Sequence, residues 1–240
     1  MTRILIIMPA LNEEESLPAT LKELREIVDD PYILVIDDGS TDATAEVASR
    51  AGAVSAQLPF TLGVGGAVRV GLHYAQRNGY DRAVVIDADG QHDPAGITAL
   101  LEALDHGADM AVGSRFAAGT DDYPVGRTRR QAMRFLGAIV RVLTGQRFSD
   151  VTSGFRAFDR PVIELLAREY PVEYLADTVE ALLIVRYAGF RVDEVPISMR
   201  PRAAGVPSTR RVNLVINYLR LLIGILGSAS RRARLRKDEA

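Results

Sequence analysis

The stretch VVIDADGQHDP, residues 84–94, places several acids directly after a run of apolar residues. An apolar run bounded by turn-favouring residues is typical of a buried strand, and we expect a strand over residues 83–89. Carboxylates repel one another at short range, so a cluster of them at a strand end suggests that a positive group binds there. The stretch therefore indicates both a buried sheet and a candidate ligand site.

The acids within this stretch have different expected roles. On an extended backbone Asp87 and Asp89 point to the same side and Ala88 to the other. A lone Asp-x-Asp is a weak signal, but at the end of a buried strand and close to Gln91 it offers hard oxygen ligands. Such ligands suit Mg²⁺ or Mn²⁺ that is bound together with phosphates. Asp93 precedes a proline, and we expect it mainly to cap the next helix.

Apolar runs alternate with helix-like stretches through the first half of the chain. We expect strands over residues 3–9, 32–38, 53–59, 83–89 and 108–115, and helices over residues 16–28, 40–52, 65–79 and 93–107, the first two opened by Ser16 and Ser40. This alternation predicts a single α/β domain with a mainly parallel twisted sheet, helices on both faces and a Rossmann-like N-terminal half. Ligands of such sheets bind outside the carboxyl ends of the strands, where Asp37, Asp38, Asp87 and Asp89 are expected.

The second half is less regular. We expect a basic helix over residues 126–145, a helix from Pro161, a helix over residues 176–188, a strand over residues 190–199 and an apolar helix-like segment over residues 212–227. The apolar segment is interrupted by Asn213, Asn217 and Arg220, and it is shorter than the roughly 20 apolar residues that span a bilayer. It is predicted to be a core helix, an interfacial helix or a contact for a partner subunit.

Charge divides the chain into two halves. Residues 1–114 carry 18 acids and 7 basic residues, whereas residues 115–240 carry 13 acids and 22 basic residues, nearly all of them Arg. An acidic half suits a cation and an Arg-rich half suits phosphates, because the guanidinium fork matches phosphate oxygens. The chain has no Cys, which excludes disulfides and thiolate metal sites and favours a reducing compartment.

The glycine-rich stretch LGVGGAVRVG, residues 62–71, resembles a dinucleotide-binding loop only superficially. It follows the third expected strand rather than the first, and its spacing differs from G-x-G-x-x-G. We interpret it as a tight turn into a closely packed helix.

Six motifs follow one another in a characteristic order: PALNEE (9–14), VIDDGSTD (35–42), DADGQHDP (87–94), GSRF (113–116), TSGFRAF (152–158) and EVPISMRPR (194–202). Together they resemble family 2 glycosyltransferases of the GT-A fold, and in particular the polyprenyl-phosphate (dolichol-phosphate-type) sugar transferases. The resemblance covers roughly residues 3–208. It implies a GT-A domain over residues 1–210, with a nucleotide-binding half (1–114) and an acceptor half (115–210), followed by an apolar helix and basic tail over residues 211–240.

The resemblance also implies roles for individual residues. The nucleotide-sugar is expected at Pro9, Leu11, Glu13, Asp37, Asp38, Asp87, Ala88, Asp89 and Arg115. The metal ligands are expected to be Asp89 and Gln91, and the acceptor phosphate is expected at Arg129, Arg130, Arg200 and Arg202. The expected catalytic residues are Asp89 and Arg115. Asp177 and Glu180 join them as candidate bases if the acceptor is a hydroxyl.

The chemistry of the acceptor separates the leading function from its alternatives. The leading hypothesis is inverting transfer of a sugar from a UDP- or GDP-sugar to polyprenyl phosphate, with Mg²⁺ or Mn²⁺, at the cytoplasmic face of a membrane. A phosphate monoester has a second pKa of about 6 and needs no general base near neutral pH. A hydroxyl acceptor would need a carboxylate base, for which Asp177 and Glu180 are the candidates. A sugar-nucleotide pyrophosphorylase and a non-enzymatic binding protein are the remaining alternatives.

The expected partners follow from the leading hypothesis. They are the nucleotide-sugar donor, the lipid acceptor, and either the membrane face itself or a small membrane protein. We expect no nucleic acid, and a homo-oligomer is left open.

Overall fold

The computed structural model describes residues 2–29, 31–117, 127–171 and 177–200, without the side chains of residues 127–130 and 132. The expected C-terminal helix and tail, together with Arg202, lie outside the described residues.

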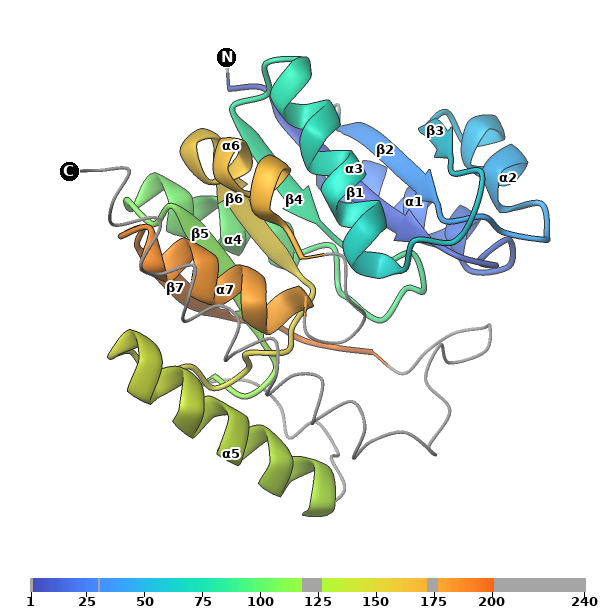
Figure 1. The fold of residues 1–240 in the computed structure, drawn as a ribbon. Coiled ribbons are helices and arrows are strands. Elements are labelled where there is room, and N and C mark those ends of the chain that lie inside the picture. Colours follow the sequence, from blue (N-terminus) through green and yellow to red (C-terminus); the bar gives the residue numbers. More distant parts are fainter. Residues whose placement is uncertain (1, 30, 118–126, 172–176, 201–240) are drawn as a thin grey trace.

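A seven-stranded sheet forms the centre of the described fold (Figure 1). Its strands are β1 (Ile4–Ala10), β2 (Tyr32–Asp37), β3 (Val54–Gln57), β4 (Arg82–Val85), β5 (Met110–Ser114), β6 (Arg156–Asp159) and β7 (Val192–Pro196). They lie in the order β3-β2-β1-β4-β6-β5-β7. All neighbouring strands are parallel except β6, which runs antiparallel to both β4 and β5. The prediction of a mainly parallel sheet is confirmed.

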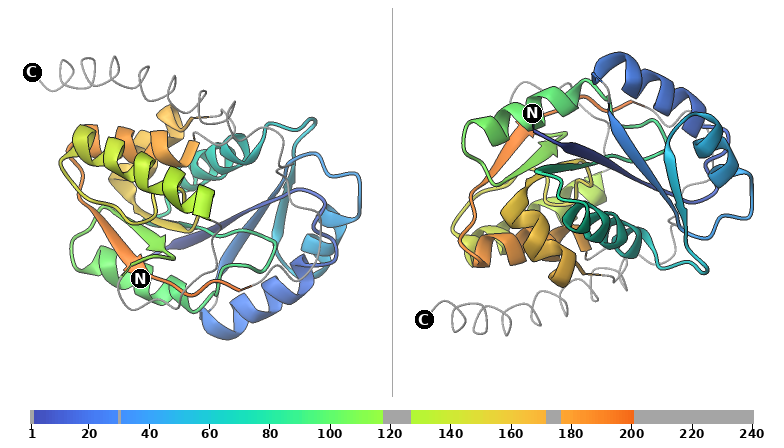
Figure 2. Two further views of the ribbon diagram at one scale, coloured as in Figure 1. Left: turned by 90° about the horizontal axis from the view of Figure 1, so that it is seen from below. Right: turned by 90° about the horizontal axis from the view of Figure 1, so that it is seen from above.

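Helices cover both faces of this sheet, as Figure 2 shows from two sides. They are α1 (Leu17–Ile27), α2 (Thr44–Arg50), α3 (Val64–Arg77), α4 (Gly96–Asp105), α5 (Arg127–Thr144), α6 (Arg160–Glu169) and α7 (Asp177–Tyr187). One core cluster joins α3, α5, α6 and α7 to residues such as Leu5 and Ile7 of β1. A second cluster joins α1, α2 and α4 to Ile6 and Met8 of the same strand. Alternate residues of a strand face opposite sides, so β1 is buried on both faces.

Two predictions about strands are corrected. Strand β4 ends at Val85, so Asp87 and Asp89 do not lie on an extended strand. Asp89 lies in a turn instead, next to Gly90 with a φ of 72°, and Asp87 lies between the strand and this turn. Strand β6 was not predicted, because TSGFRAF lacks a long apolar run.

The predicted helix starts are partly wrong. Ser16 occupies the N-cap position of α1 but makes no capping bond, since its hydroxyl donates to Glu13. Helix α2 begins at Thr44 rather than after Ser40. Helix α4 begins at Gly96, and Asp93 closes the preceding turn by accepting the backbone N–H of Ala95 at 3.0 Å.

The glycine-rich stretch packs as expected. A Cβ on Gly66 would lie 2.4 Å from the Cβ of Leu62, and one on Gly71 would lie 2.3 Å from Cγ2 of Ile7. These positions require glycine for close approach between α3 and its surroundings, and the structural interpretation of this stretch is confirmed.

No helix among the described residues is both long enough and apolar enough to cross a membrane.

Candidate functional site

Two adjacent carboxylates end β2 and are held mainly by backbone N–H groups. Asp37 Oδ1 accepts the N–H of Ser40 at 2.8 Å. Asp38 accepts the N–H groups of Leu62 and Gly63 at 2.7 and 2.8 Å, where the chain enters α3. Burial raises the pKa of Asp38, and the neighbouring Asp37 adds to this, although the two N–H bonds act in the opposite direction. The two acids thus sit at the carboxyl edge of the sheet, as predicted.

The loop after β1 is fastened to the loop after β2. Asn12 has a φ of 55°, and its side-chain oxygen accepts the N–H of Thr41 at 2.8 Å. The N–H of Glu13 donates to the hydroxyl of Thr44 at 2.9 Å, and its carboxylate accepts the Ser16 hydroxyl at 2.6 Å. Glu13 is therefore buried at the site edge with a fixed side chain.

The loop after β4 brings Asp87, Asp89 and Gln91 to the same edge. Asp89 Oδ1 accepts the N–H of Gln91 at 3.0 Å, which fixes the turn between them. Nδ1 of His92 lies 3.4 Å from Oδ2 of Asp87, and the His92 ring stacks on Phe155 at 5.0 Å between centroids. His92 is buried, so it positions the loop from beneath rather than facing solvent.

The donor set of this loop fits a magnesium-type ion better than a metal caged by protein alone. Among the described residues no group of three or more His, Cys, Asp or Glu side chains could hold a metal. Mg²⁺ in nucleotide sites is commonly bound by one or two carboxylates together with phosphate oxygens and water. Asp89 with Gln91 supplies oxygens of that kind, so the residues present fit such an ion.

Asp177 approaches the acidic edge from another helix. It is the first residue of α7, and the Cβ position of Gly65 in α3 lies 3.3 Å from its Oδ2. Burial raises the pKa of Asp177 to about 6; the charge of Asp87 contributes to the rise, and the charge of Arg156 opposes it. Glu180, one turn further along α7, is also buried. The structure thus places Asp177 against α3 and within electrostatic reach of Asp87.

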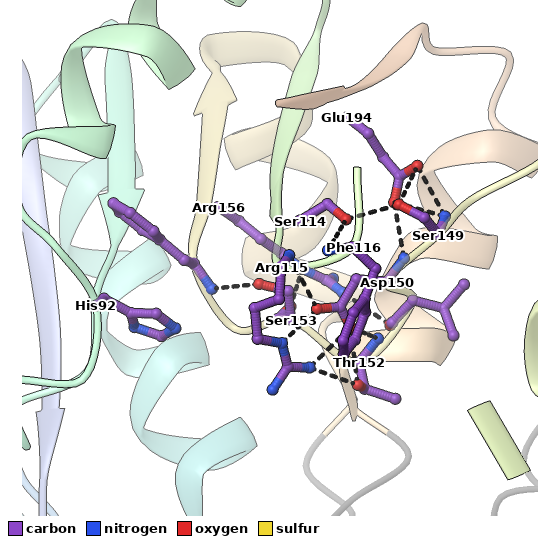
Figure 3. A network of polar contacts seen from close by, with 12 residues as sticks. His92, Ser114, Arg115, Phe116, Ser149, Asp150, Thr152, Ser153, Arg156 and Glu194 are labelled. Carbon is purple, nitrogen blue, oxygen red and sulfur yellow. Dashed lines mark hydrogen bonds and ion pairs between the residues drawn. The ribbon is translucent and has the colours of Figure 1, made fainter. Parts of the chain in front are cut away.

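Arg115 follows β5 and is held by a buried carboxylate. Its Nε and Nη2 both donate to Asp150, the latter at 2.8 Å, and Nη2 also donates to the Thr152 hydroxyl at 3.1 Å (Figure 3). Asp150 is fully buried, and burial alone would raise its pKa. The hydrogen bonds and charge of Arg115 outweigh that effect and hold the pKa of Asp150 below its ordinary value.

A second carboxylate, Glu194 of β7, binds the backbone of the loop that carries Asp150. It accepts the N–H groups of Ser149 and Asp150 at 2.8 and 2.9 Å. The Ser149 hydroxyl in turn lies 2.7 Å from that of Ser114, the last residue of β5 (Figure 3). The network therefore joins β5, β7 and the loop before β6, and it fixes the position of Arg115.

Sequence reasoning missed Asp150, Glu194 and the buried Arg156. Arg156 is 1% exposed, and its Nε and Nη2 donate to the backbone oxygens of Ser153 and Val151 at 2.8 and 3.3 Å. Burial lowers the pKa of this guanidinium. A usable signal was present for both acids, because Asp150 precedes the TSGFRAF motif and Glu194 opens EVPISMRPR.

Arg200 is engaged on the acidic side of the molecule. Its Nη1 donates to both carboxylate oxygens of Glu23 in α1 at 2.7 and 2.8 Å, and its Nη2 lies 3.1 Å from Asp93. Its N–H donates to the backbone oxygen of Gln91 at 2.8 Å. Arg200 therefore fastens the end of the described chain to the loop after β4.

The remaining expected residues are placed as follows. Pro9 is buried in β1, Leu11 is 38% exposed just after it, and Ala88 is buried between the two acids of its motif. Arg129 and Arg130 lie in α5, but their side chains are outside the described part of the structure.

Comparison with known proteins places the chain in a family. Residues 5–166 match the family model for "Glycosyl transferase family 2". The chain is 32% identical to a polyprenol monophosphomannose synthase of Mycolicibacterium smegmatis, over 88% of this chain and 83% of that protein. It is 33% identical to an undecaprenyl-phosphate mannosyltransferase of Micrococcus luteus, over 85% and 86%. A UDP-N-acetylglucosamine–dolichyl-phosphate N-acetylglucosaminyltransferase of Methanococcus voltae is 29% identical, over 81% and 84%.

The fold has a solved counterpart. Glucosyl-3-phosphoglycerate synthase from Mycobacterium tuberculosis, crystallised with Mn²⁺, UDP and glucosyl-3-phosphoglycerate, superposes with a TM-score of 0.73 over 94% of this chain and 79% of that one. At 20% identity this likeness concerns the fold. The sequence matches and the shared GT-A fold agree with the motifs, and the chain belongs to glycosyl transferase family 2.

Proposed function

We propose that this glycosyltransferase moves a sugar from a UDP- or GDP-sugar to the phosphate of a polyprenyl phosphate, with inversion at the anomeric carbon. The observation that carries the proposal is the acidic edge of Asp37, Asp38, Asp87 and Asp89, with Arg115 fixed after β5. The relatives support the same acceptor, because two proteins about one third identical to this chain are named for sugar transfer to polyprenyl-type phosphates.

The donor is proposed to bind across the ends of β1, β2 and β4. The carboxylates of Asp37 and Asp38 are hydrogen-bond acceptors, which suits the hydroxyl and N–H groups of a ribose and a base. Pro9, Leu11 and Glu13 line the same edge, and Asp87 and Ala88 lie on the donor-sugar side. The named relatives transfer different sugars, mannose in one case and N-acetylglucosamine in another, so they do not select the sugar of the donor.

Asp89 and Gln91 are the residues proposed to hold Mg²⁺ or Mn²⁺. A divalent ion there would supply positive charge beside the diphosphate. Arg115 is proposed to add the guanidinium charge, and its bidentate bond to Asp150 keeps that group in place.

The reaction needs little proton transfer when the acceptor is a phosphate. An acceptor phosphate oxygen attacks the anomeric carbon while the bond from that carbon to the diphosphate oxygen breaks. The electron pair leaves with the nucleoside diphosphate. Arg129, Arg130, Arg200 and Arg202 remain the proposed acceptor-phosphate contacts, at the cytoplasmic face of the membrane.

One observation favours a second acceptor class. Asp177 is buried beside the acidic edge, and burial raises its pKa to about 6, which suits a base that takes a proton from a hydroxyl. A hydroxyl acceptor on a glycan or small molecule is therefore the second candidate. Membership of family 2 glycosyltransferases leaves the pyrophosphorylase alternative without support.

The test begins with the donor. UDP- and GDP-sugars are screened for thermal stabilisation of the full chain, with Mn²⁺ and with EDTA. The stabilising donor is then incubated with polyprenyl phosphate, and the lipid fraction is treated with mild acid. An acid-labile lipid phosphosugar supports the proposal. If a hydroxyl acceptor is glycosylated, and no lipid product forms with any stabilising donor, the lipid acceptor is wrong.

A further inference from the structure

Arg156 of β6 is a buried arginine without a carboxylate partner among the described residues. It is 1% exposed, and it lies between Val85 of β4 and Val112 of β5, which both belong to the core. None of the ion pairs between described residues includes it, and its Nη1 has no hydrogen-bond partner among them. Burying a charge without a counter-charge is costly. An apolar side chain would fill this space at lower cost, so the guanidinium needs another explanation.

The buried guanidinium binds the backbone of the loop that precedes β6. Its Nε donates to the carbonyl oxygen of Ser153 at 2.8 Å, and its Nη2 donates to that of Val151 at 3.3 Å (Figure 3). These two carbonyls lie on either side of Thr152. The Thr152 hydroxyl accepts Nη2 of Arg115 at 3.1 Å and donates to Asp150 at 3.0 Å. Hydrogen bonds from a charged donor are stronger than those between neutral groups, so the guanidinium fixes the backbone on both sides of Thr152.

The same loop is held at its N–H groups by a carboxylate. Glu194 accepts the N–H groups of Ser149 and Asp150 at 2.8 and 2.9 Å. A carboxylate on N–H groups and a guanidinium on carbonyls each match the polarity of the backbone atoms that they bind. Glu194 and Arg156 therefore fix the chain before and after the segment that carries Asp150 and Thr152.

We propose that Arg156 is a positioning residue for glycosyl transfer, which acts through the loop of Thr152 on the guanidinium of Arg115. The inference rests on the proposed function, because the proposed contact of Arg115 with the diphosphate gives this orientation a role in the reaction. A misplacement of about 1 Å can slow an enzymatic reaction about 10²-fold. A residue that does not touch the substrate can therefore still control the rate.

Arg156 also acts on its surroundings through charge, which is the alternative route. Burial lowers the pKa of Arg156, and the charges of Tyr170, Asp177 and Asp150 oppose this. Burial raises the pKa of Asp177, and the charge of Arg156 opposes that rise. A lysine carries the same charge but lacks the planar fork that binds two carbonyls at once. Arg156→Lys therefore separates positioning of the loop from an effect of charge alone.

The Nε proton of Arg115, which is bonded to Asp150, reports on the loop without donor or acceptor. Its exchange with water is followed by NMR in isotope-labelled protein, and Arg115→Lys identifies the signal. We expect exchange about tenfold faster in Arg156→Met, the change that corresponds to the loss of about one hydrogen bond. Exchange should also be faster in Arg156→Lys, which carries the test if the Met variant does not fold.

Arg82→Met is the matched control. Arg82 is another largely buried arginine of the sheet, and it pairs with Asp105 and Asp159 at the opposite end of β4. Urea denaturation should show a loss of stability in this variant. The exchange of the Arg115 Nε proton and kcat should both match the parent, because Arg82 does not bind the loop of Thr152.

Steady-state kinetics, with the acceptor that the parent glycosylates, tests the role in the reaction. A misplaced Arg115 fails chiefly at the leaving diphosphate. In Arg156→Met kcat should therefore fall about 10²-fold, while the KM for the donor changes only a few-fold. Thr152→Val removes the hydroxyl that binds Arg115, and adding Arg156→Met to this variant should lower kcat by a smaller factor than in the parent.

The outcomes separate this inference from the proposed function. Exchange like that of the parent in every folded Arg156 variant would overturn the inference, and so would such exchange in Arg156→Lys alone, since charge would then suffice. Faster exchange with an unchanged kcat would mean that Arg115 has no part in transfer, and both the inference and the assigned role of Arg115 would be wrong. A parent that glycosylates only a hydroxyl acceptor contradicts the proposed acceptor alone, because exchange and the ratio of kcat values are measured equally well with that acceptor.

Discussion

The buried acids Asp37 and Asp38 differ from the buried acid Asp150 in the groups that bind their carboxylates. Asp37 and Asp38 accept backbone N–H groups, and no ion pair between described residues involves either of them. Asp150 is also buried, but it is paired bidentately with Arg115. Asp37 and Asp38 therefore keep a net negative charge at the edge of the sheet, whereas the charge of Asp150 is balanced by that of Arg115.

The difference suggests a division of labour. Backbone donors fix Asp37 and Asp38 without adding a positive charge, so the edge remains attractive to hydroxyl groups or cations of a ligand. The Arg115–Asp150 pair instead sets the position of one guanidinium. Replacing an acid of the sheet edge should therefore affect ligand binding, whereas replacing Asp150 should affect folding.

Removing the charge of Asp150 should have the largest effect. Asp150→Asn removes the buried carboxylate that pairs with Arg115, which is only 10% exposed, and we expect a loss of about 3–5 kcal/mol in the free energy of unfolding. Urea denaturation followed by circular dichroism measures this loss. Asp193→Asn breaks the exposed pair with Arg191 and serves as the control, with an expected loss below about 1 kcal/mol.

The pH dependence of this pair has a definite sign. The folded-state pKa of Asp150 lies below its unfolded value, so its stabilisation is fully present above the unfolded pKa of 3.8 and is lost as pH falls through the folded pKa. Acid unfolding of the parent should therefore be steeper below pH 3.8 than that of Asp150→Asn. Equal acid sensitivity of the two proteins would contradict the assignment.

Asp89→Asn tests the acidic edge through ligand binding. The variant keeps an oxygen that can accept the Gln91 N–H, so the turn and the fold should persist. We expect metal-dependent donor binding to be lost and turnover to fall about 10²–10³-fold. Asp93→Asn, in the same loop but paired with Arg200, is the matched control. Unchanged turnover in Asp89→Asn would refute its role as a metal ligand.

The sequence predicted the acidic edge better than the Arg115 network for a physical reason. Strand-end acids such as Asp37 and Asp87 follow apolar runs, and parallel strands bring their carboxyl ends together. Asp150 and Glu194 meet because β6, which follows the loop of Asp150, and β7, which carries Glu194, both pair with β5. That pairing depends on contacts between distant segments, which no local pattern encodes.

Local turn geometry was the other source of error. The apolar run of β4 was expected to continue as strand through Asp89, but the strand ends at Val85. The turn at Gly90 and the hydrogen bond from Gln91 to Asp89 compete with strand pairing there. The acids still reach the site, although by a turn rather than by strand alternation.

Asp177→Asn separates the two acceptor classes by pH. The folded-state pKa of Asp177 is about 6 against an ordinary value of 3.8, so ionisation of this buried group costs stability as pH rises through 6. The variant should be more stable than the parent at neutral pH, by at most about 3 kcal/mol. Unfolding midpoints at acidic and neutral pH measure this difference.

The same variant reports on catalysis. A lipid phosphate itself titrates near pH 6, so with this acceptor the rise of kcat/KM through pH 6 should survive in Asp177→Asn. With a hydroxyl acceptor that rise belongs to the base and should vanish with the carboxylate. Loss of the rise with polyprenyl phosphate as acceptor would mean that Asp177 acts as a base and that the phosphate mechanism is incomplete.

Arg200→Gln should have the smallest effect, and it tests whether the acidic edge extends to α1. Arg200 is 43% exposed and bonds Glu23 and Asp93, so its removal should cost below about 1 kcal/mol of stability. Arg160→Gln, which breaks the exposed pair with Glu164, is the control for such a loss. The Arg200 guanidinium is already paired with the carboxylates of Glu23 and Asp93, so we expect the KM for the acceptor to change only a few-fold. A rise above about tenfold would show that Arg200 leaves these carboxylates to bind the acceptor phosphate, so that the acidic edge and the phosphate site share one residue.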